Sequence, residues 1–282
     1  MGCHVSISGK IFQSVDRALA LGCTAMQIFS RNPRGWKSSP LLEDDVRIFK
    51  KRLRESGIDP LVIHTPYLIN LASPDNGLYE KSIDSFRIDL ERAHMLGAAF
   101  LVTHLGSSKD MGSHYGIKRV ADAFNLLLER GIQGNIRILL ENTAGSGSFI
   151  GSRLDQIKEI IEAVKENSLL GLCYDTCHGF ASGYDLRDPE SLDNLIGEIE
   201  KHIGLKRLQL LHLNDSKGDF QSGIDRHEHI GWGKIGIKGF ELLINHPSLH
   251  EIPMILETPK KSDEDDMMNL STVKNLRKSL DS

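Results

Sequence analysis

The chain has 282 residues, of which 40% are hydrophobic and 26% are charged, as in ordinary globular proteins. This length suffices for one large α/β domain with a full core. No run approaches the roughly 18 consecutive apolar residues that a membrane span requires. The N-terminus shows no basic head followed by an apolar segment, so it does not resemble a secretion signal. The composition therefore argues against a membrane protein.

The four cysteines and the net charge bear on compartment and partner. Cysteines are present at Cys3, Cys23, Cys173 and Cys177, with neither a secreted disulfide pattern nor a Cys-x-x-Cys zinc spacing. We therefore expect a reduced, intracellular protein located in the cytoplasm. A formal net charge of -4 argues mildly against a nucleic-acid partner, but bound divalent metal ions would add positive charge at one place. Composition thus leaves the partner open.

Strand-like and helix-like segments alternate along the whole chain. The expected strands, in chain order, are Cys3–Ile7, Ala25–Ser30, Leu61–Thr65, Phe100–Leu105, Ile136–Asn142, Gly171–Asp175, Leu208–Leu213 and Met254–Thr258. Helical periodicity predicts helices over Glu80–Leu96, Leu154–Val164 and Leu192–Ile203. Glycines such as Gly57 and Gly97 follow helical segments, where a left-handed residue is expected. This order predicts a single (β/α)₈ TIM barrel that spans residues 1–282, because no linker divides the chain.

Six of the expected strands run into a side chain that binds divalent metals. In chain order these residues are His64, His104, Glu141, Asp175, His212 and Glu257. Their spacing of roughly 35 to 45 residues corresponds to one strand-plus-helix unit of such a barrel. All parallel strands of a barrel end on the same face, so the six side chains should converge on one pocket. The pattern therefore predicts a metalloenzyme.

The combination of residues supports metal binding more strongly than any one of them. A single histidine at a strand end is more often a hydrogen-bonded core residue than a ligand. Burying three histidines and three carboxylates together without a metal ion would leave charges uncompensated, at a cost of several kcal/mol each. Imidazole nitrogens and carboxylate oxygens, without a thiolate, suit Zn²⁺, with Mn²⁺ or Fe²⁺ as alternatives.

Three further candidate ligands lie in loops after the strands. His178 follows Asp175 by three residues, and Asp225 and His227 form an Asp-x-His motif. This motif lies within the longest irregular stretch, residues 215–236, on the catalytic face of the expected barrel. His229 could replace His227 as a ligand, and spacing alone does not separate the two.

The motifs at these positions resemble endonuclease IV, the zinc-dependent apurinic/apyrimidinic endonuclease family. The order and spacing of the matching segments agree over essentially the whole chain, and together they are highly specific. The segments are Leu139-Leu140-Glu141-Asn142-Thr143-Ala144-Gly145, Tyr174-Asp175-Thr176-Cys177-His178, Leu211-His212-Leu213-Asn214-Asp215-Ser216-Lys217, Asp225-Arg226-His227 and Ile255-Leu256-Glu257-Thr258.

The resemblance implies three Zn²⁺ ions and a ligand set for each. His64 and His104 would hold the first ion, and Glu141 would bridge it to the second and act as the catalytic residue. The second ion would also take Asp175, His212 and Glu257. The third would be held by His178, Asp225 and His227, which selects His227 over His229.

The resemblance also implies the reaction and the substrate. It implies a hydrolase, a zinc-dependent deoxyribonuclease IV of the phage-T4 type. This monomeric DNA-repair enzyme would cleave the phosphodiester 5′ to abasic sites in duplex DNA and trim blocked 3′ ends. The products would be a 3′-hydroxyl and a 5′-deoxyribose phosphate. Arg34, Tyr67 and Leu68 would be DNA-binding residues that enter the duplex as wedges, although Tyr67 and Leu68 could instead be packed in their loop.

Two other functions would use at most part of this set of residues. A sugar isomerase of the xylose-isomerase-like class would explain four of the ligands but not the rest, and a non-catalytic DNA-binding or metal-storage barrel would leave the complete set unused. His4, on the first strand, is a candidate to contact the metal ligands. The acidic run Ser262–Asp266 is expected to be a solvated turn.

Overall fold

The computed structural model describes residues 1–129, 131 and 136–278. Within these residues, eight parallel strands close into a barrel, in the order β1, β10, β7, β6, β5, β4, β3 and β2. The barrel strands are β1 (Gly2–His4), β2 (Ala25–Phe29), β3 (Leu61–His64), β4 (Phe100–Thr103), β5 (Arg137–Glu141), β6 (Leu170–Asp175), β7 (Leu208–Leu213) and β10 (Met254–Leu256). The predicted (β/α)₈ barrel is confirmed. Its extent as a single domain over residues 1–282 stays a prediction.

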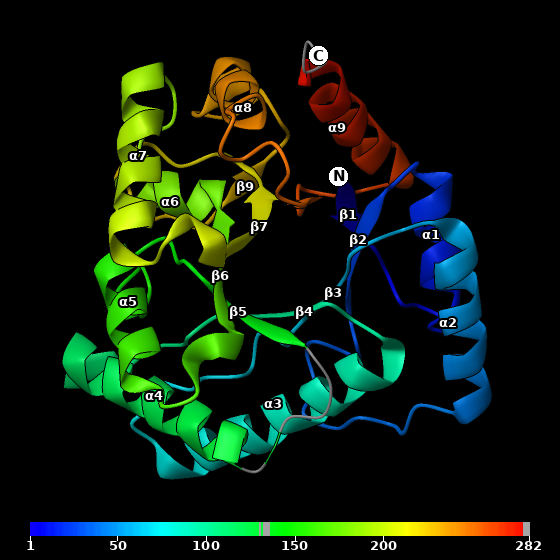
Figure 1. The fold of residues 1–282 in the computed structure, drawn as a ribbon, viewed down its shortest axis with the longest axis vertical. Coiled ribbons are helices and arrows are strands. Elements are labelled where there is room, and N and C mark those ends of the chain that lie inside the picture. Colours follow the sequence, from blue (N-terminus) through cyan, green and yellow to red (C-terminus); the bar gives the residue numbers. More distant parts are fainter. Residues whose placement is uncertain (130, 132–135, 279–282) are drawn as a thin grey trace.

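Helices cover the outside of the barrel (Figure 1). They are α1 (Gln13–Ala20), α2 (Glu43–Ser56), α3 (Asn76–Leu96), α4 (Ser113–Glu129), α5 (Leu154–Ala163), α7 (Pro189–His202), α8 (Gly236–Ile244) and α9 (Asp263–Leu276). The short helix α6 (Thr176–Ser182) instead follows β6 directly at the carboxyl ends of the strands and contacts β6 and β7. Single 3₁₀ turns span Lys109–Met111, Asn167–Leu169 and Leu205–Arg207. Among the residues that the structure describes, no helix has the length and apolar character needed to cross a membrane.

The strands agree closely with the predicted ranges, and the helices differ mainly at their starts. Strand β7 has the predicted bounds, whereas β1 ends at His4 rather than Ile7. Helix α3 begins at Asn76, before the predicted Glu80, because the Asp75 carboxylate accepts a hydrogen bond from the N–H of Leu78 at 2.7 Å. The helix opens with Asn76 and Gly77, which are poor helix formers, so the apolar pattern alone missed this start.

Helix α7 shows the same effect at its first turn. The predicted start was Leu192, but the helix begins at Pro189. The Asp188 carboxylate accepts from the N–H of Ser191 at 3.0 Å, and proline is favourable in a first turn, where its missing N–H has no partner to lose. The left-handed caps are confirmed at Gly57 (φ 68°) and Gly97 (φ 79°), which end α2 and α3.

The long segment after β7 is not irregular throughout, which corrects the expectation. Strand β8 (Asp215–Ser216) pairs with β9 (His227–Glu228) in a small antiparallel sheet. The buried Asp215 carboxylate accepts hydrogen bonds from the N–H groups of Gly231, Gly233 and Ile235 at 2.9 to 3.0 Å. One side chain therefore holds the far end of this segment, which local sequence patterns could not indicate.

The acidic run Ser262–Asp266 is not a solvated turn, which is a second correction. It forms the start of α9, where Ser262 and Asp265 make a reciprocal capping box. Carboxylates in a first helical turn interact favourably with the helix dipole. Asp266 is buried and forms an ion pair with Lys260.

Candidate metal centre

The interior of the barrel has two layers that differ in chemistry. The lower layer is a buried apolar cluster made of Ala25, Val62, Val102, Leu139, Cys173, Leu210 and Ile255. Two residues further along the same chain segments lie Gln27, His64, His104, Glu141, Asp175, His212 and Glu257. Side chains two residues apart in a strand point to the same side, so the polar layer lies directly above the apolar one. The predicted convergence of strand-end side chains is observed.

The first group of potential ligands contains His64, His104 and Glu141. Nε2 of His64 lies 3.0 Å from Oε2 of Glu141, and Nε2 of His104 lies 3.5 Å from the same oxygen. Potential ligand atoms of the three residues all lie within 4.8 Å of one another. This group can hold one cation.

The second group contains Glu141, Asp175, His212 and Glu257. Nδ1 of His212 lies 3.0 Å from Oε1 of Glu141 and 3.4 Å from Oε2 of Glu257. The two oxygens of Glu141 thus face different groups, because Oε2 faces the first and Oε1 the second. This is the geometry of a bridging carboxylate.

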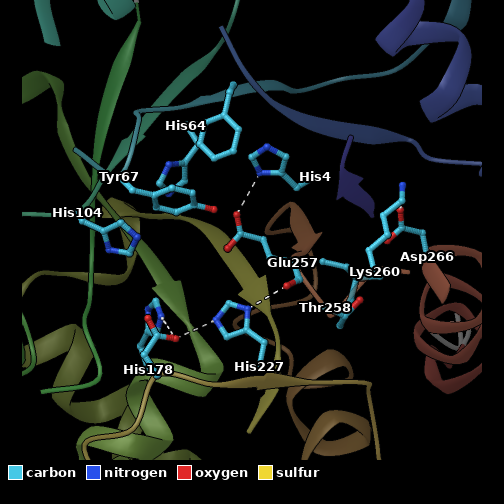
Figure 2. Close-up of a pocket in the computed structure, with 13 residues that line it drawn as sticks. His4, His64, Tyr67, His104, His178, His227, Glu257, Thr258, Lys260 and Asp266 are labelled. Carbon is cyan, nitrogen blue, oxygen red and sulfur yellow. Dashed lines mark hydrogen bonds and ion pairs between the residues drawn. The ribbon is translucent and has the colours of Figure 1, made fainter. Parts of the chain in front are cut away.

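The third group contains His178, Asp225 and His227. Oδ1 of Asp225 lies 3.1 Å from Nε2 of His178 and 3.4 Å from Nε2 of His227. Strand β9 carries His227, and its pairing with β8 brings the Asp-x-His motif back to the barrel mouth. Figure 2 shows His178 and His227 on one side of the cavity and His64 and His104 across from them.

His178 is not in a loop, which corrects the expectation for this residue. It lies on α6, and the Asp175 carboxylate caps that helix by accepting the N–H of His178 at 2.8 Å. Asn214 donates to the other oxygen of Asp175 at 2.6 Å. The short helix was missed because its seven residues, Thr176–Ser182, are too few to display a helical period.

The histidine rings are oriented as metal ligands usually are. Carbonyl oxygens only accept, so the Nδ1–H groups donate: His64 to Thr65 O at 2.7 Å, His178 to Asn142 O at 3.0 Å and His227 to Glu257 O at 2.9 Å. Each of these rings therefore presents Nε2 to its group, which is how protein scaffolds fix metal-binding imidazoles. Within the described residues, Nε2 of His227 is buried and has no hydrogen-bond partner. These observations fit a bound cation.

Electrostatics also favour a cation at this place. Burial alone would raise the pKa of Glu141, but the nearby His104 and His212 hold it well below its usual range. Burial lowers the pKa of His178, but the Asp175 and Asp225 carboxylates outweigh burial and raise it to about 10. The Glu141 carboxylate is thus ionised, and in the metal-free protein a protonated His178 supplies compensating positive charge.

His229, the alternative to His227, faces away from the three groups. Its Nδ1 accepts from the side-chain amide of Asn269 at 2.9 Å, and its ring packs edge-on against Trp232. His4 lies beside Glu257, with Nδ1 3.3 Å from Oε1 (Figure 2). The structure therefore separates two histidines that spacing alone left equivalent, and it brings His4 to the ligands as expected.

The three candidate DNA-binding residues differ in exposure, and only Tyr67 of the three lines the cavity of about 330 Å³ at the metal centre. Tyr67 is 65% exposed, lines the cavity and stands edge-on to Phe29 at 5.3 Å between ring centroids. Leu68 is half-buried, and Arg34 is exposed in the loop after β2. The exposed tyrosine ring is available to a ligand at the mouth, whereas Leu68 is partly packed.

Sequence reasoning missed three residues that contact the potential ligands. Gln27 bonds to His212 and Glu257, and Asn142 and Asn214 bond to Asp175. Gln27 lies two residues after Ala25 on β2, the place that a potential ligand occupies on six of the other barrel strands. The position of Gln27, two residues after an apolar strand residue, is visible in the sequence. Glutamine is not a usual metal ligand, so this position alone did not indicate a contact with the metal ligands.

Comparison with known proteins assigns the chain to a family. A family model described as "Xylose isomerase-like TIM barrel" matches residues 15–281. "Probable endonuclease 4" of Methanoculleus marisnigri is 46% identical over 276 residues, covering 98% of each chain. "Probable endonuclease 4" of Chloroflexus aurantiacus is 44% identical over 276 residues, covering 98% of this chain and 97% of the relative.

Solved structures agree with these relatives. The crystal structure of endonuclease IV from Thermus thermophilus is 35% identical, covers 97% of each chain and superimposes with a TM-score of 0.87. A D-tagatose 3-epimerase-like protein, 20% identical over 98% of this chain and 97% of that one, has a TM-score of 0.74 and shares the fold alone. On its sequence, its barrel and the residues at its mouth, the chain belongs to the endonuclease IV family of xylose isomerase-like TIM barrels.

Proposed function

We propose that this chain is a DNA-repair endonuclease that hydrolyses the phosphodiester 5′ to abasic sites in duplex DNA. The products would be a 3′-hydroxyl and a 5′-deoxyribose phosphate. The observation that carries the proposal is the convergence of nine potential ligands in three groups, two of which share Glu141. A fourth grouping, Asp175, Cys177 and His227, adds only the Cys177 thiol, and burial raises the pKa of that thiol, which disfavours a thiolate ligand. The relatives named endonuclease 4 support a nuclease rather than a sugar isomerase.

Three Zn²⁺ ions are the proposed cofactors, one for each group. His64, His104 and Glu141 would hold the first, and Asp175, His212 and Glu257 would join Glu141 around the second. His178, Asp225 and His227 would hold the third. Such ions, when bound, acidify water and neutralise charge on a phosphoryl group and its leaving oxygen. Nitrogen and carboxylate donors without a bound thiolate favour Zn²⁺ over softer ions.

Glu141 is the proposed catalytic residue because it links the first two groups. Its carboxylate is buried, and its oxygens lie 3.0 Å from His64 on one side and 3.0 Å from His212 on the other. A rigid link of this kind keeps two cation positions at one separation. The apolar layer beneath keeps water away from the link and strengthens the electrostatic interactions above it.

DNA recognition is proposed for Arg34, Tyr67 and Leu68. An abasic nucleotide has lost its base stacking, so extruding it from the duplex costs less than flipping an intact nucleotide. The exposed ring of Tyr67 at the mouth of the cavity is suited to occupy the gap, and Arg34 to meet the phosphate backbone. The same mouth would admit blocked 3′ ends, and we propose that the enzyme acts as a monomer.

A duplex that carries one tetrahydrofuran analogue tests the proposal, because this abasic analogue cannot undergo β-elimination. The protein is loaded with Zn²⁺, its metal content is measured, and the ends of the products are identified. A nick that leaves a 3′-hydroxyl on the 5′ side of the lesion is expected. An intact duplex with metal-loaded protein would contradict the proposal and favour a sugar isomerase or epimerase, which shares this barrel.

A further inference from the structure

Gln27 lies on β2 between two side chains of the second group. It is fully buried. Its Oε1 lies 2.8 Å from Nε2 of His212, and its Nε2 lies 2.6 Å from Oε1 of Glu257. The same amide nitrogen lies 2.9 Å from Nδ1 of His4. One amide therefore contacts two potential metal ligands and the half-buried side chain of His4.

The amide can have only one orientation in this environment. The Oε1 atom of Gln27 only accepts hydrogen bonds, and its amide nitrogen only donates them. Turning the amide over would place Oε1 against the carboxylate of Glu257 and the amide nitrogen against His212. Two oxygens that both only accept would then lie at 2.6 Å, which is unfavourable in a buried site. His212 accordingly donates its Nε2–H to Oε1 of Gln27. The amide nitrogen of Gln27 in turn donates to Oε1 of Glu257.

This arrangement decides which atoms of His212 and Glu257 remain available. With its proton on Nε2, a neutral His212 has its lone pair on Nδ1, the atom that faces Glu141 at 3.0 Å. Oε1 of Glu257 is occupied by Gln27, which leaves Oε2, 3.4 Å from Nδ1 of His212. Both free atoms point into the second group.

His212 differs in this respect from three other histidines of the centre. His64, His178 and His227 are oriented by backbone carbonyls, which no substitution removes directly. His212 is oriented by a side chain, and it presents Nδ1 instead of Nε2. The ligand geometry of the second group therefore depends on a residue that can be replaced.

We propose that Gln27 is a positioning residue for a divalent cation in the second group. It selects Nδ1 of His212 and Oε2 of Glu257 as the cation-binding atoms. The inference rests on the proposed function, because the second group must bind a metal ion. Residues that orient metal ligands in this way typically contribute about 10- to 100-fold to metal affinity.

The test replaces Gln27 with methionine, which has a similar volume but neither donates nor accepts strongly. Gln209→Met is the matched control, because Gln209 lies near the amino end of β7, away from the metal groups at the carboxyl ends. Zn²⁺ is removed from the full-length proteins with a chelator, and its affinity and stoichiometry are measured by competition with a chromogenic chelator. Circular dichroism and urea unfolding verify that each variant is folded.

We expect Gln27→Met to bind one of its three Zn²⁺ ions about 10- to 100-fold more weakly, while the other two and the Gln209→Met protein are unaffected. A second readout is long-range proton–nitrogen NMR of the histidine rings. It should show a protonated Nε2 on His212 in the metal-loaded parent and loss of that signal's protection from exchange in Gln27→Met.

Two results would overturn the inference without touching the proposed function. One is equal Zn²⁺ affinity at all sites in the parent and Gln27→Met. The other is a loss of affinity that Gln209→Met shares, since that would reflect packing and not ligand orientation. A parent protein that binds no Zn²⁺ would instead overturn the proposed function itself.

Discussion

The two layers inside the barrel come from the same strands, yet they do different things. Leu139 and Glu141 illustrate the contrast, because they lie two residues apart on β5 and point to the same side. Leu139 belongs to the apolar cluster, and Glu141 belongs to two of the three ligand groups. A residue of the stabilising core and a residue of the ligand groups thus lie one strand repeat apart, about 6.6 Å along the chain.

The lower layer also contributes to the upper one. A dry apolar floor lowers the local dielectric, so that charges above it interact more strongly than they would in water. The same floor makes an uncompensated charge costly, which is why the polar layer is densely paired. Substitutions in the upper layer should therefore change catalysis and metal binding, whereas substitutions in the lower layer should change stability.

The largest effect is expected in the upper layer, for Glu141→Gln. Glutamine keeps the volume of the side chain but removes the charge that faces both the first and the second group. We expect turnover on a tetrahydrofuran duplex to fall by orders of magnitude, on the order of a thousandfold or more, measured under single-turnover conditions. Near-normal turnover would refute the bridging role of Glu141.

The matching change in the lower layer is Leu139→Ala. Removing a fully buried leucine side chain should lower the free energy of unfolding by about 2–5 kcal/mol, measured by urea denaturation. Zn²⁺ stoichiometry should stay as in the parent protein, because Leu139 belongs to the apolar floor and is not one of the potential ligands. A loss of metal from this variant would show that the two layers are not separable.

The pH dependence of stability should differ between metal-free and loaded protein. His178 has its pKa raised in the folded metal-free state from 6.5 to about 10, so it stabilises the fold fully below pH 6.5. That contribution, a few kcal/mol at most, is lost as the pH rises toward 10. Metal must displace these protons, so Zn²⁺ affinity should rise over the same range.

Urea unfolding of the chelated protein across pH 6 to 10 measures this dependence, with the zinc-loaded protein as the control. The loaded protein should not lose stability in that window, because its histidines are already deprotonated. Metal-free stability that is constant or increasing from pH 6.5 to 10 would contradict the assigned charge on His178.

The smallest effect is expected at the rim, for Tyr67→Ala. Loss of an aromatic contact should weaken binding to abasic duplex DNA about tenfold, within the ~1–3 kcal/mol typical of stacking. Zn²⁺ content should be unchanged. Leu19→Ala is a suitable control, because Leu19 is also exposed but lies near the end of α1, before the amino end of β2. Equal affinities of Tyr67→Ala and the parent would remove the wedge role.

Much of the fold could be predicted because its signals are local. The strands are short apolar runs, and β7 was predicted to the residue. The starts of α3 and α7 were missed, since Asp75 and Asp188 cap them with single side-chain hydrogen bonds outside the apolar period. The small β8–β9 sheet was missed because its two-residue strands carry no pattern of their own.

By itself the sequence determined which residue types end the strands, and with the parallel barrel this implied that they meet. It did so because an alternation of period two and the polarity of a parallel strand are properties of neighbouring residues. Only the tertiary structure decided that His229 turns to Asn269 while His227 joins Asp225. Only it brought Gln27 within hydrogen-bonding distance of His212, 185 residues away. Such contacts depend on how the barrel closes, and no local pattern encodes the distance between residues brought together by closure.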